Sequence, residues 1–368
     1  MARERALILS FARKFLKSGG AIYLSYNARP GWNKLDPFRR VFREALRGRN
    51  VDTCEGLAIA REIYAQLHAA RAPAILGGAT PNALASLDEI SPEALIADYA
   101  NDFAEPLYVT DVAADFAAID CALAGAAVMA ESLTVLMGHE PFKSILDRMP
   151  TIAGRELAKD FLRDTMLRRD VFVRGGKRLA ADSSDMIMQG LAFALEQPAA
   201  NVRYEMRLPF GDMRFDNARA RALVETLAES PHTLGELVEK ARGQGEEPQA
   251  IIANVHALLV TGQIRPVYRA TREAAAGART LRNAIRARAT TPEAIGYLPS
   301  AFGTAFAVPI ADQLFMEMPE TKGAEAMADA AAAKLHAMAG RSREALARRA
   351  RNFPVIKRYY TALGLMTG

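Results

Sequence analysis

The residue types best suited to chemistry gather in one polar segment near the start of the chain. Residues 25–32 read Ser-Tyr-Asn-Ala-Arg-Pro-Gly-Trp and include the only tryptophan. Aromatic rings can bind a cation through their π faces, and an amide side chain offers a carbonyl acceptor. The predicted substrate- or cofactor-facing residues are Ser25, Tyr26, Asn27, Pro30 and Trp32. The alternative is a simple turn at Asn27 and Pro30, and for Trp32 a place in the core is favoured.

The elements around this segment form a helix followed by a strand. Leu7, Phe11 and Phe15 recur every four residues, which predicts a helix over residues 3–17 with these side chains on one face. Two glycines, suited to a helix end, precede the apolar run Ala21–Leu24, which predicts a short buried strand. In open α/β sheets, ligands bind at the carboxyl ends of strands, so the polar segment follows directly where a ligand is expected.

Three segments resemble one bacterial family, the class I S-adenosylmethionine-dependent methyltransferases that bear a methyltransferase regulatory domain. They are residues 19–32, residues 103–112 (Phe-Ala-Glu-Pro-Leu-Tyr-Val-Thr-Asp-Val) and residues 168–175 (Arg-Arg-Asp-Val-Phe-Val-Arg-Gly). Residues 19–32 are similar to the fifth strand of the family's catalytic sheet. Because members include protein-lysine methyltransferases, the resemblance implies transfer of a methyl group to a protein side chain, with lysine as one acceptor.

The resemblance also implies that the cofactor-binding strands one to four lie upstream of Met1. Gly77-Gly78 and Gly175-Gly176 lack the remainder of a nucleotide-binding glycine pattern. We therefore expect S-adenosylmethionine to be the family's cofactor but not to be bound by this chain, which makes it an incomplete methyltransferase, inactive alone. The resemblance implies that in the complete enzyme Tyr26 and Trp32 would line the acceptor channel. It assigns no catalytic residue.

Composition places the chain among ordinary globular proteins. It has 368 residues, half of them apolar, with a formal net charge of +5. Cys54 and Cys121 are predicted to be buried thiols of a reducing cytoplasm, and no apolar run is long enough for a membrane span. Arginines concentrate in residues 39–49, 265–288 and 341–358, which indicates either solvated helix faces or a surface for an acidic partner.

The fold class is predicted to be mostly α, within α+β. The predicted parts are the end of a methyltransferase catalytic domain (1–35), a helical insertion suited to dimerisation (36–100), a return to the catalytic sheet (101–130), a regulatory or linking domain (131–200), a winged-helix-like domain (201–269) and a helical C-terminal region (270–368). The expected partners are a protein substrate or regulator and a second copy of the chain.

The sequence also bears on two further kinds of site, a DNA-binding helix and a metal site. Residues 248–259, the helix that would read DNA in a winged helix, hold Gln249, Asn254 and His256 but no Lys or Arg, so DNA is disfavoured as a partner. The scattered histidines predict no metal site. Asp160 and Asp164 are interpreted as a surface ion-pair face. The functional alternatives to an incomplete enzyme are a non-enzymatic protein-binding module and, less favoured, a DNA-binding regulator.

Overall fold

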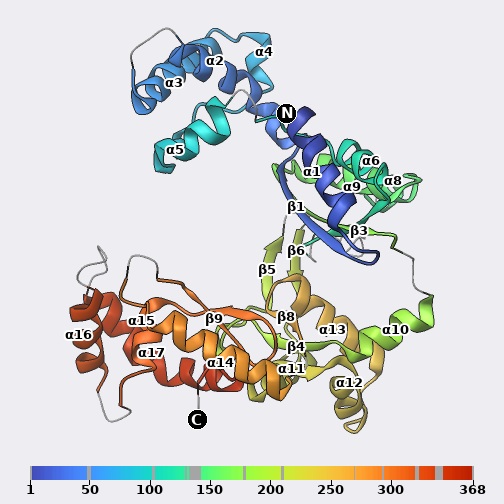
Figure 1. Cartoon of the computed structure of the whole chain (residues 1–368), viewed down its shortest axis with the longest axis vertical. Coiled ribbons are helices and arrows are strands. Elements are labelled where there is room, and N and C mark those ends of the chain that lie inside the picture. The colour runs from blue at the N-terminus through green and yellow to red at the C-terminus, as the bar shows by residue number, and fades with distance from the viewer. Residues whose placement is uncertain are drawn as a thin grey trace. The chain divides into compact units, whose positions relative to one another are not determined.

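The computed structural model describes residues 2–47, 51–101, 104–128, 131, 142–176, 180–208, 211–268, 270–291, 294–319, 323–335 and 343–366. The chain divides into two compact units, residues 1–178 and 179–368. Figure 1 shows the elements of both in chain order by colour.

The first unit combines one small sheet with helices. Its described helices are α1 (Ala2–Phe15), α2 (Asp36–Leu46), α3 (Thr53–Ala69), α4 (Pro73–Leu76), α5 (Pro92–Leu95), α6 (Val109–Ala117), α8 (Phe142–Asp147) and α9 (Ile152–Arg163). Its described strands are β1 (Ala21–Asn27), β2 (Cys121–Ala126) and β3 (Leu167–Arg174). The helix expected over residues 3–17 and the strand expected over residues 21–24 are thus confirmed, and the strand is three residues longer.

The sheet has the order β1-β3-β2 with antiparallel pairs throughout. Strand β3 pairs along the whole of β1, from Ala21 opposite Val173 to Asn27 opposite Leu167. One face of the sheet is buried, and Phe172 at its centre stacks on Phe116 of α6. The prediction of a fully buried first strand is wrong, because Ala21, Tyr23 and Ser25 are exposed on its other face.

Helix α1 presents an apolar stripe to solvent. Leu7, Phe11 and Phe15 share one face, as predicted, and each is at least 60% exposed. The rings of Phe11 and Phe15 lie 4.8 Å apart. Leu9 and Leu16, by contrast, pack against the core beneath the sheet. The helix therefore has a second apolar face that no described part of the first unit covers.

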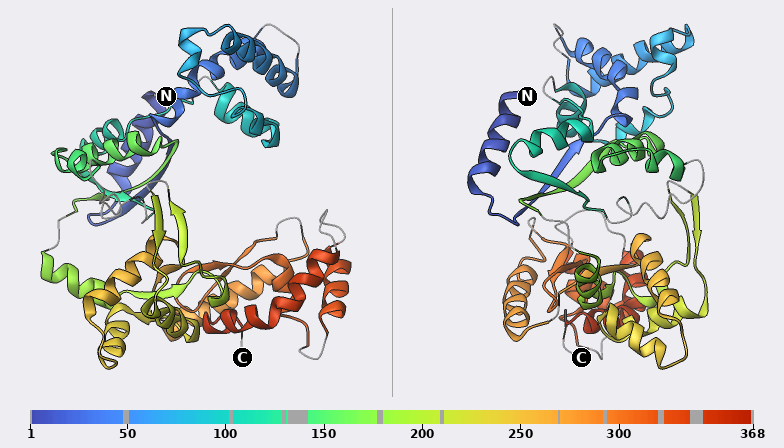
Figure 2. Two further views of the ribbon diagram at one scale, coloured as in Figure 1. Left: turned by 180° about the vertical axis from the view of Figure 1, so that it is seen from behind. Right: turned by 90° about the vertical axis from the view of Figure 1, so that its right-hand side faces the viewer.

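Residues 36–100 fold as helices around a core of their own, with Phe38, Phe42 and Tyr64 wholly buried. Figure 2 shows these helices, coloured blue to cyan, gathered into one group. Trp32 belongs to this core: it is 5% exposed and packs on Tyr99 at 5.4 Å. The favoured structural role of Trp32 is thereby confirmed.

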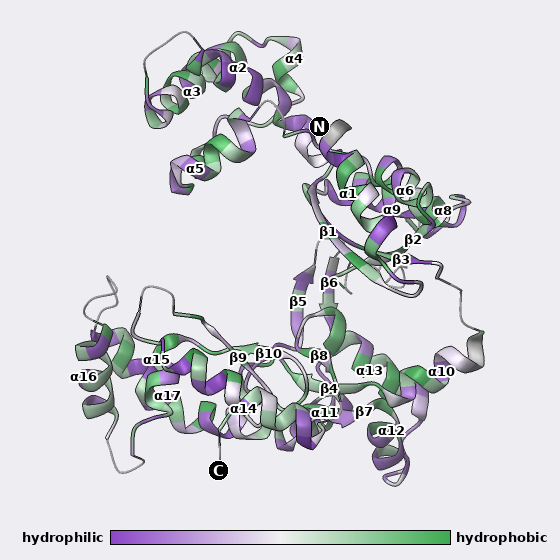
Figure 3. Ribbon diagram, viewed as in Figure 1, coloured by the Kyte–Doolittle hydropathy of each residue, from purple (hydrophilic) through white to green (hydrophobic). Residues whose placement is uncertain are grey.

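The second unit is also mainly helical. Its described helices are α10 (Ala181–Gly190), α11 (Ala218–Glu229), α12 (Leu234–Arg242), α13 (Pro248–Val260), α14 (Arg272–Arg286), α15 (Ile310–Phe315), α16 (Ala324–Leu335) and α17 (Arg343–Ala362). Its described strands are β4 (Ala192–Leu195), β5 (Glu205–Leu208), β6 (Gly211–Arg214), β7 (His232–Thr233), β8 (Ile264–Val267), β9 (Tyr297–Pro299) and β10 (Ala305–Ala307). Figure 3 shows α16 mostly in hydrophobic and β5 mostly in hydrophilic colours.

Helices α11 to α13 pack beside a sheet of order β7-β4-β8. A capping box begins α12: the Thr233 side chain accepts from the Glu236 N–H, and the Glu236 carboxylate accepts from the Thr233 N–H. Strand β4, which lies before all three helices in sequence, forms the centre of this sheet. Three helices are followed by strand β8, while the assignment as a winged helix and the six-part division stay predictions.

The α15 and α17 helices are joined by a buried charged group. Asp312 is fully buried and accepts hydrogen bonds from Arg349, at 2.5 and 2.7 Å, and from the Tyr360 hydroxyl at 2.6 Å. Burial and the Asp312 charge raise the pKa of Tyr360 above its usual range. This cluster fixes α17 against α15 in the C-terminal region.

The structure is mostly helical with small antiparallel sheets, in agreement with the predicted α+β class. Of the two cysteines, Cys121 is buried as predicted, but Cys54 is exposed, so the prediction of a buried thiol there is wrong. Arg39, counted among the arginines of a surface cluster, is 3% exposed and lies over the Trp32 ring. None of the described helices is both long enough and apolar enough to cross a bilayer.

Candidate functional site

The loop after β1 is held by backbone contacts on both sides. The Ala28 N–H donates to the Met166 carbonyl at 2.8 Å, and the Arg29 N–H donates to the Leu107 carbonyl at 3.0 Å. Gly31 donates to the Thr165 carbonyl at 3.1 Å. The carboxyl end of β1 is thus fixed between the residues just before β3 and the segment before α6, and the latter belongs to one of the three segments that carry the family resemblance.

A cavity of about 450 Å³ opens beside this loop. Its walls are Arg5, Arg29, Glu105, Pro106, Leu107, Tyr108, Asp111 and Asp115. Asp111 and Asp115 lie one turn apart on α6, and the Arg29 guanidinium lies 6.0 Å from the Tyr108 ring. The cavity therefore offers an aromatic wall and carboxylates, the groups that bind a cationic side chain.

The Arg29 side chain holds the rim of this cavity in place. Its Nε donates to the Pro106 carbonyl at 3.1 Å, and its Nη1 donates to the Asn33 side chain at 2.6 Å. Asp36 lies 3.6 Å from the same guanidinium. Asp36 is shared between Arg29 and Arg39, and the bond to Pro106 lets Arg29 tether the loop after β1 to the segment before α6.

Tyr26 points from β1 into a buried charged network. Its hydroxyl donates to the Asp170 carboxylate at 2.6 Å, and Arg168 binds the same carboxylate through two nitrogens at 2.8 and 2.9 Å. Burial and the Asp170 charge raise the pKa of Tyr26 far above its usual range. Tyr26 is therefore a neutral hydrogen-bond donor that ties β1 to β3.

The Arg168 guanidinium lies at the centre of this network. It also binds Asp160, at 2.7 Å, and Glu156, at 2.9 Å, both on α9. Glu156 in turn pairs with Lys159, whose ammonium group donates to the Glu131 carbonyl at 2.8 Å. Three carboxylates thus face two cations in a group whose members are all at most 7% exposed.

The interpretation of Asp160 and Asp164 as one surface face is wrong. Asp160 is fully buried against Arg168, whereas Asp164 ends α9 in the left-handed conformation (φ 54°) and pairs with Lys34 at 2.6 Å. The helix ends at Asp164, so the two carboxylates do not continue along one exposed face. Burial raises the pKa of Asp160 to about 6, although Arg168 opposes this shift.

This raised pKa predicts a pH-dependent stability. A carboxyl group with a higher pKa in the folded state binds protons more tightly there, so its contribution is full at low pH and is lost as pH rises through about 6. Lowering the pH from 7.5 to 5.5 is expected to raise the free energy of unfolding of the first unit by about 1 kcal/mol through this group. Urea unfolding followed by Trp32 fluorescence measures it.

The matched variant is Asp160→Asn, which keeps the shape of the side chain and removes its titration. Subtracting its pH profile from that of the unaltered protein isolates Asp160 from the other titrating groups. The variant is expected to lose the rise between pH 7.5 and 5.5. Identical pH profiles for the two proteins would show that Asp160 titrates in its ordinary range.

The structure brings only some of the predicted site residues together. Tyr26 and Asn27 lie at the end of β1, where Asn27 is half-buried and its carbonyl accepts from the Leu107 N–H at 2.9 Å. Ser25 is exposed on the open face of the sheet, while Trp32 points into the helical core. Pro30, half-buried, follows a cis peptide bond at Arg29. Their roles toward a substrate or cofactor stay predictions.

Sequence reasoning missed the residues that surround this end of β1. Tyr108 and Asp111 lie in a segment noted only for its resemblance, and Arg168 and Asp170 in another. Charged residues inside a strand are rare unless they are paired in the core. Arg168 and Asp170 are two apart in β3, so they share one face of the sheet, and this spacing carried a signal for the buried network.

The structure also bears on the helix that would read DNA and on metal binding. Asn254, the asparagine on the helix that would face DNA, is buried and bonds the Asn217 side chain at 2.9 Å. The Asn254 side chain is thus hydrogen-bonded inside the second unit. Within the described part of the chain, no group of three or more His, Cys, Asp or Glu side chains is arranged to hold a metal ion.

Comparison with known proteins bears on the segments around the site. Residues 91–174 match the model of the predicted methyltransferase regulatory domain. An uncharacterized protein of Synechocystis sp. is 24% identical over 324 residues, which are 87% of this chain and 64% of the relative. The chain thus spans just under two thirds of the length of this curated relative.

Solved structures share the fold. PKMT2 from Rickettsia typhi in complex with AdoHcy superposes with a TM-score of 0.59 at 14% identity, covering 98% of this chain and 77% of PKMT2. PKMT2 in a second structure gives 0.58 at 15% identity, with 100% and 79% covered. The matched domain at residues 91–174 contains β2, β3 and α6 and so supplies two of the three strands at the site. Residues 91–174 carry the predicted methyltransferase regulatory domain, and the chain's resemblance to the methyltransferases that bear this domain is confirmed.

Proposed function

We propose that the first unit is the acceptor-side part of an S-adenosylmethionine-dependent methyltransferase that modifies a protein side chain, with lysine as the acceptor. The observation that carries this proposal is the pairing of β3, from the matched domain, along the whole length of β1. That pairing brings the Tyr-Asn end of β1 and the cavity beside α6 into one compact group. PKMT2, which shares the fold, binds AdoHcy.

Neither glycine pair of the described residues fits a nucleotide-binding turn for the adenosylmethionine cofactor. Gly77 and Gly78 follow the short helix α4 instead of a strand, and a Cβ on Gly78 would lie 2.5 Å from the Tyr64 hydroxyl. A Cβ on Gly175, which follows β3, would lie 3.0 Å from the Ser18 hydroxyl oxygen. Neither pair forms an open phosphate- or nucleoside-binding turn.

The edge of β1 is the place where a further strand could join the sheet. Strand β1 lies at the edge of its sheet, and among the described residues no strand pairs with its outer side. The exposed stripe of Leu7, Phe11 and Phe15 lies on the helix directly before it. A further strand on β1, with a helix over this stripe, would satisfy open backbone groups and bury apolar surface. The chain alone would then be inactive.

The cavity suits recognition of a lysine side chain. Asp111 and Asp115 provide carboxylates that attract the ammonium group, whereas Glu105 pairs with Arg5 at 4.0 Å, and Tyr108 provides an aromatic wall. Methyl transfer requires a neutral amine in line with the methyl group and shielded from water. Asn27 stays proposed as a residue that faces the acceptor, while Tyr26, whose hydroxyl is bound to Asp170, would position the end of β1.

A non-enzymatic protein-binding module is the second candidate. It is favoured by the misfit of both glycine pairs to a cofactor and by a large apolar groove in the second unit. The two candidates can be distinguished by one measurement. An enzyme would transfer methyl groups in a reaction that depends on this chain, whereas a binding module would not.

The test adds the purified chain and tritiated S-adenosylmethionine to an extract of the source cells from which this chain has been removed. The extract supplies any polypeptide that completes the sheet. We expect protein labelling that depends on the added chain, appears as methyl-lysine after hydrolysis, and is absent with the chain alone. An extract that labels equally with and without the chain would contradict methyl transfer and leave the binding module.

The variant Asp111→Asn/Asp115→Asn tests the cavity. Loss of both charges is expected to lower labelling about tenfold, since a charged contact contributes roughly 1–2 kcal/mol. The control is Glu89→Gln/Asp185→Asn, which removes two exposed carboxylates outside the cavity. Equal labelling by the two variants would exclude the cavity as the acceptor site.

A further inference from the structure

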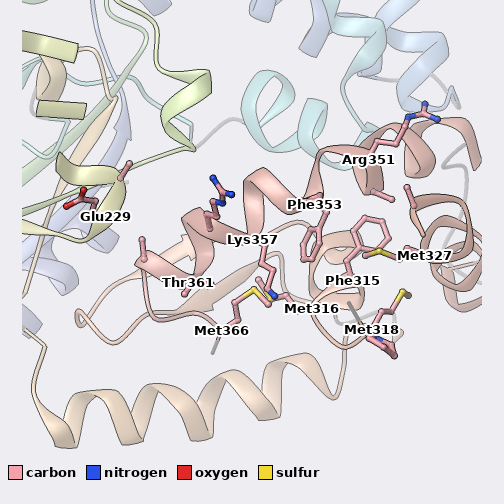
Figure 4. Close-up of a pocket in the computed structure, with 17 residues that line it drawn as sticks. Glu229, Phe315, Met316, Met318, Met327, Arg351, Phe353, Lys357, Thr361 and Met366 are labelled. Carbon is pink, nitrogen blue, oxygen red and sulfur yellow. The ribbon is translucent and has the colours of Figure 1, made fainter. Parts of the chain in front are cut away.

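The second unit holds a groove of about 1100 Å³ between α17 and the segment around α15 and α16. Figure 4 shows the side chains that line it. Its floor is apolar: Phe315 and Phe353 meet edge to face at 5.4 Å, and four methionines surround them. These are Met316, Met318, Met327 and Met366.

The floor of the groove can adapt its shape to different apolar side chains. Methionine is unbranched and polarisable, so a methionine-rich surface accepts apolar side chains of different shapes. Met316, Met318 and Met366 are only half-buried, and so part of each side chain faces the groove.

The groove is elongated along one helix. Its lining on α17 runs from Ala350 through Pro354 and Thr361 to Ala362, which is three turns of one face. At 1.5 Å per residue, this face is about 18 Å long. A partner helix of about 12 residues has the same length, and its large side chains would fill a volume that exceeds most small-ligand pockets.

The rim of the groove is positively charged. Arg351, Lys357 and Arg358 on α17 line it, against the single carboxylate of Glu229. Arg351 pairs with Glu325 at 3.2 Å, but both side chains are more than half exposed, so this pair is weak and can exchange partners. The rim therefore complements acidic residues on either side of an apolar stripe.

We propose that this groove binds an amphipathic helix of a partner protein, with large apolar residues at i, i+3 or i+4 and i+7 and Asp or Glu on the flanks. Helix-in-groove recognition uses this pattern, with the apolar face laid into the groove and charges at its border. The proposal does not depend on methyl transfer by the first unit.

The probe is a fluorescein-labelled 18-residue peptide of Leu, Phe, Ala and Glu with this pattern, titrated with the full chain and followed by anisotropy. A dissociation constant of about 10 µM is expected, a typical affinity for a short helical peptide. A peptide of the same composition, scrambled to lose the stripe, is expected to bind at least about tenfold more weakly. Equal binding of both peptides, or none of either, would overturn the proposal.

Two variants and a control locate the binding. Met318→Gln/Met366→Gln, which keeps side-chain length, and Lys357→Glu/Arg358→Glu are each expected to weaken binding about tenfold. The control is Arg348→Glu, a charge reversal at an exposed arginine of α17 outside the lining, with less than about a twofold effect. If Arg348→Glu weakens binding as much as the rim variant, the peptide is held by general charge and the groove is not its site.

Discussion

Replacing Arg168 with alanine is expected to lower the free energy of unfolding of the first unit by about 3–5 kcal/mol, a large part of the stability of a typical domain. Arg168 is the only group that joins Asp160, Glu156 and Asp170 among the described residues. Its removal leaves carboxylates buried with too few cations, which costs far more than the loss of a surface pair. Urea unfolding followed by Trp32 fluorescence reports this unit alone, since Trp32 is the only tryptophan.

The matched control is Arg169→Ala, one residue along the same strand. Arg169 is exposed on the open face of the sheet, so its loss is expected to change stability by less than about 0.5 kcal/mol. The comparison separates burial of the charge from the loss of an arginine in β3. Similar small effects of both substitutions would mean that the buried network does not hold β1, β3 and α9 together.

A second large effect is expected from Gly31→Ala, in the loop at the carboxyl end of β1. A Cβ at Gly31 would lie 2.6 Å from the Thr165 carbonyl oxygen and 2.7 Å from that of Asp164. Both neighbours are backbone atoms that cannot rotate away, so the loop must shift. The expected cost is about 2–3 kcal/mol, the upper part of the range for overpacking.

Gly77→Ala is the control for this substitution. No atom lies within 4 Å of a Cβ built on Gly77, whose φ of −87° suits alanine. Its stability is therefore expected to stay the same or rise by up to about 1 kcal/mol. If Gly31→Ala unfolds at the same urea concentration as Gly77→Ala, the close approach of this loop to the segment before β3 is wrong.

Local patterns were enough to predict the elements that carry the site. The four-residue repeat of Leu7, Phe11 and Phe15 predicted α1, and the short apolar run after two glycines predicted β1. These predictions succeeded because helix and strand periods are local properties of the sequence.

The contacts among these elements could not be predicted in the same way. Tyr26 and Asp170 are 144 residues apart, and no local pattern relates them. Asp160 resembles a surface residue because Lys159 and Arg163 flank it, yet it faces the core, where Arg168 from another element neutralises it. Periodicity shows which residues share a face, but the partner of that face is set by the tertiary fold. The stripe of Leu7, Phe11 and Phe15 shows the same limit. Its spacing placed the three side chains on one helix face, but did not indicate that this face is exposed to solvent.

The most direct test of the account is calorimetric titration of the purified chain with S-adenosylmethionine. The account predicts no saturable heat and no rise in the unfolding temperature reported by Trp32, because the described residues form no cradle for the cofactor. Binding at micromolar strength would contradict it, and would place a complete cofactor site at the Ser25 to Trp32 end of β1.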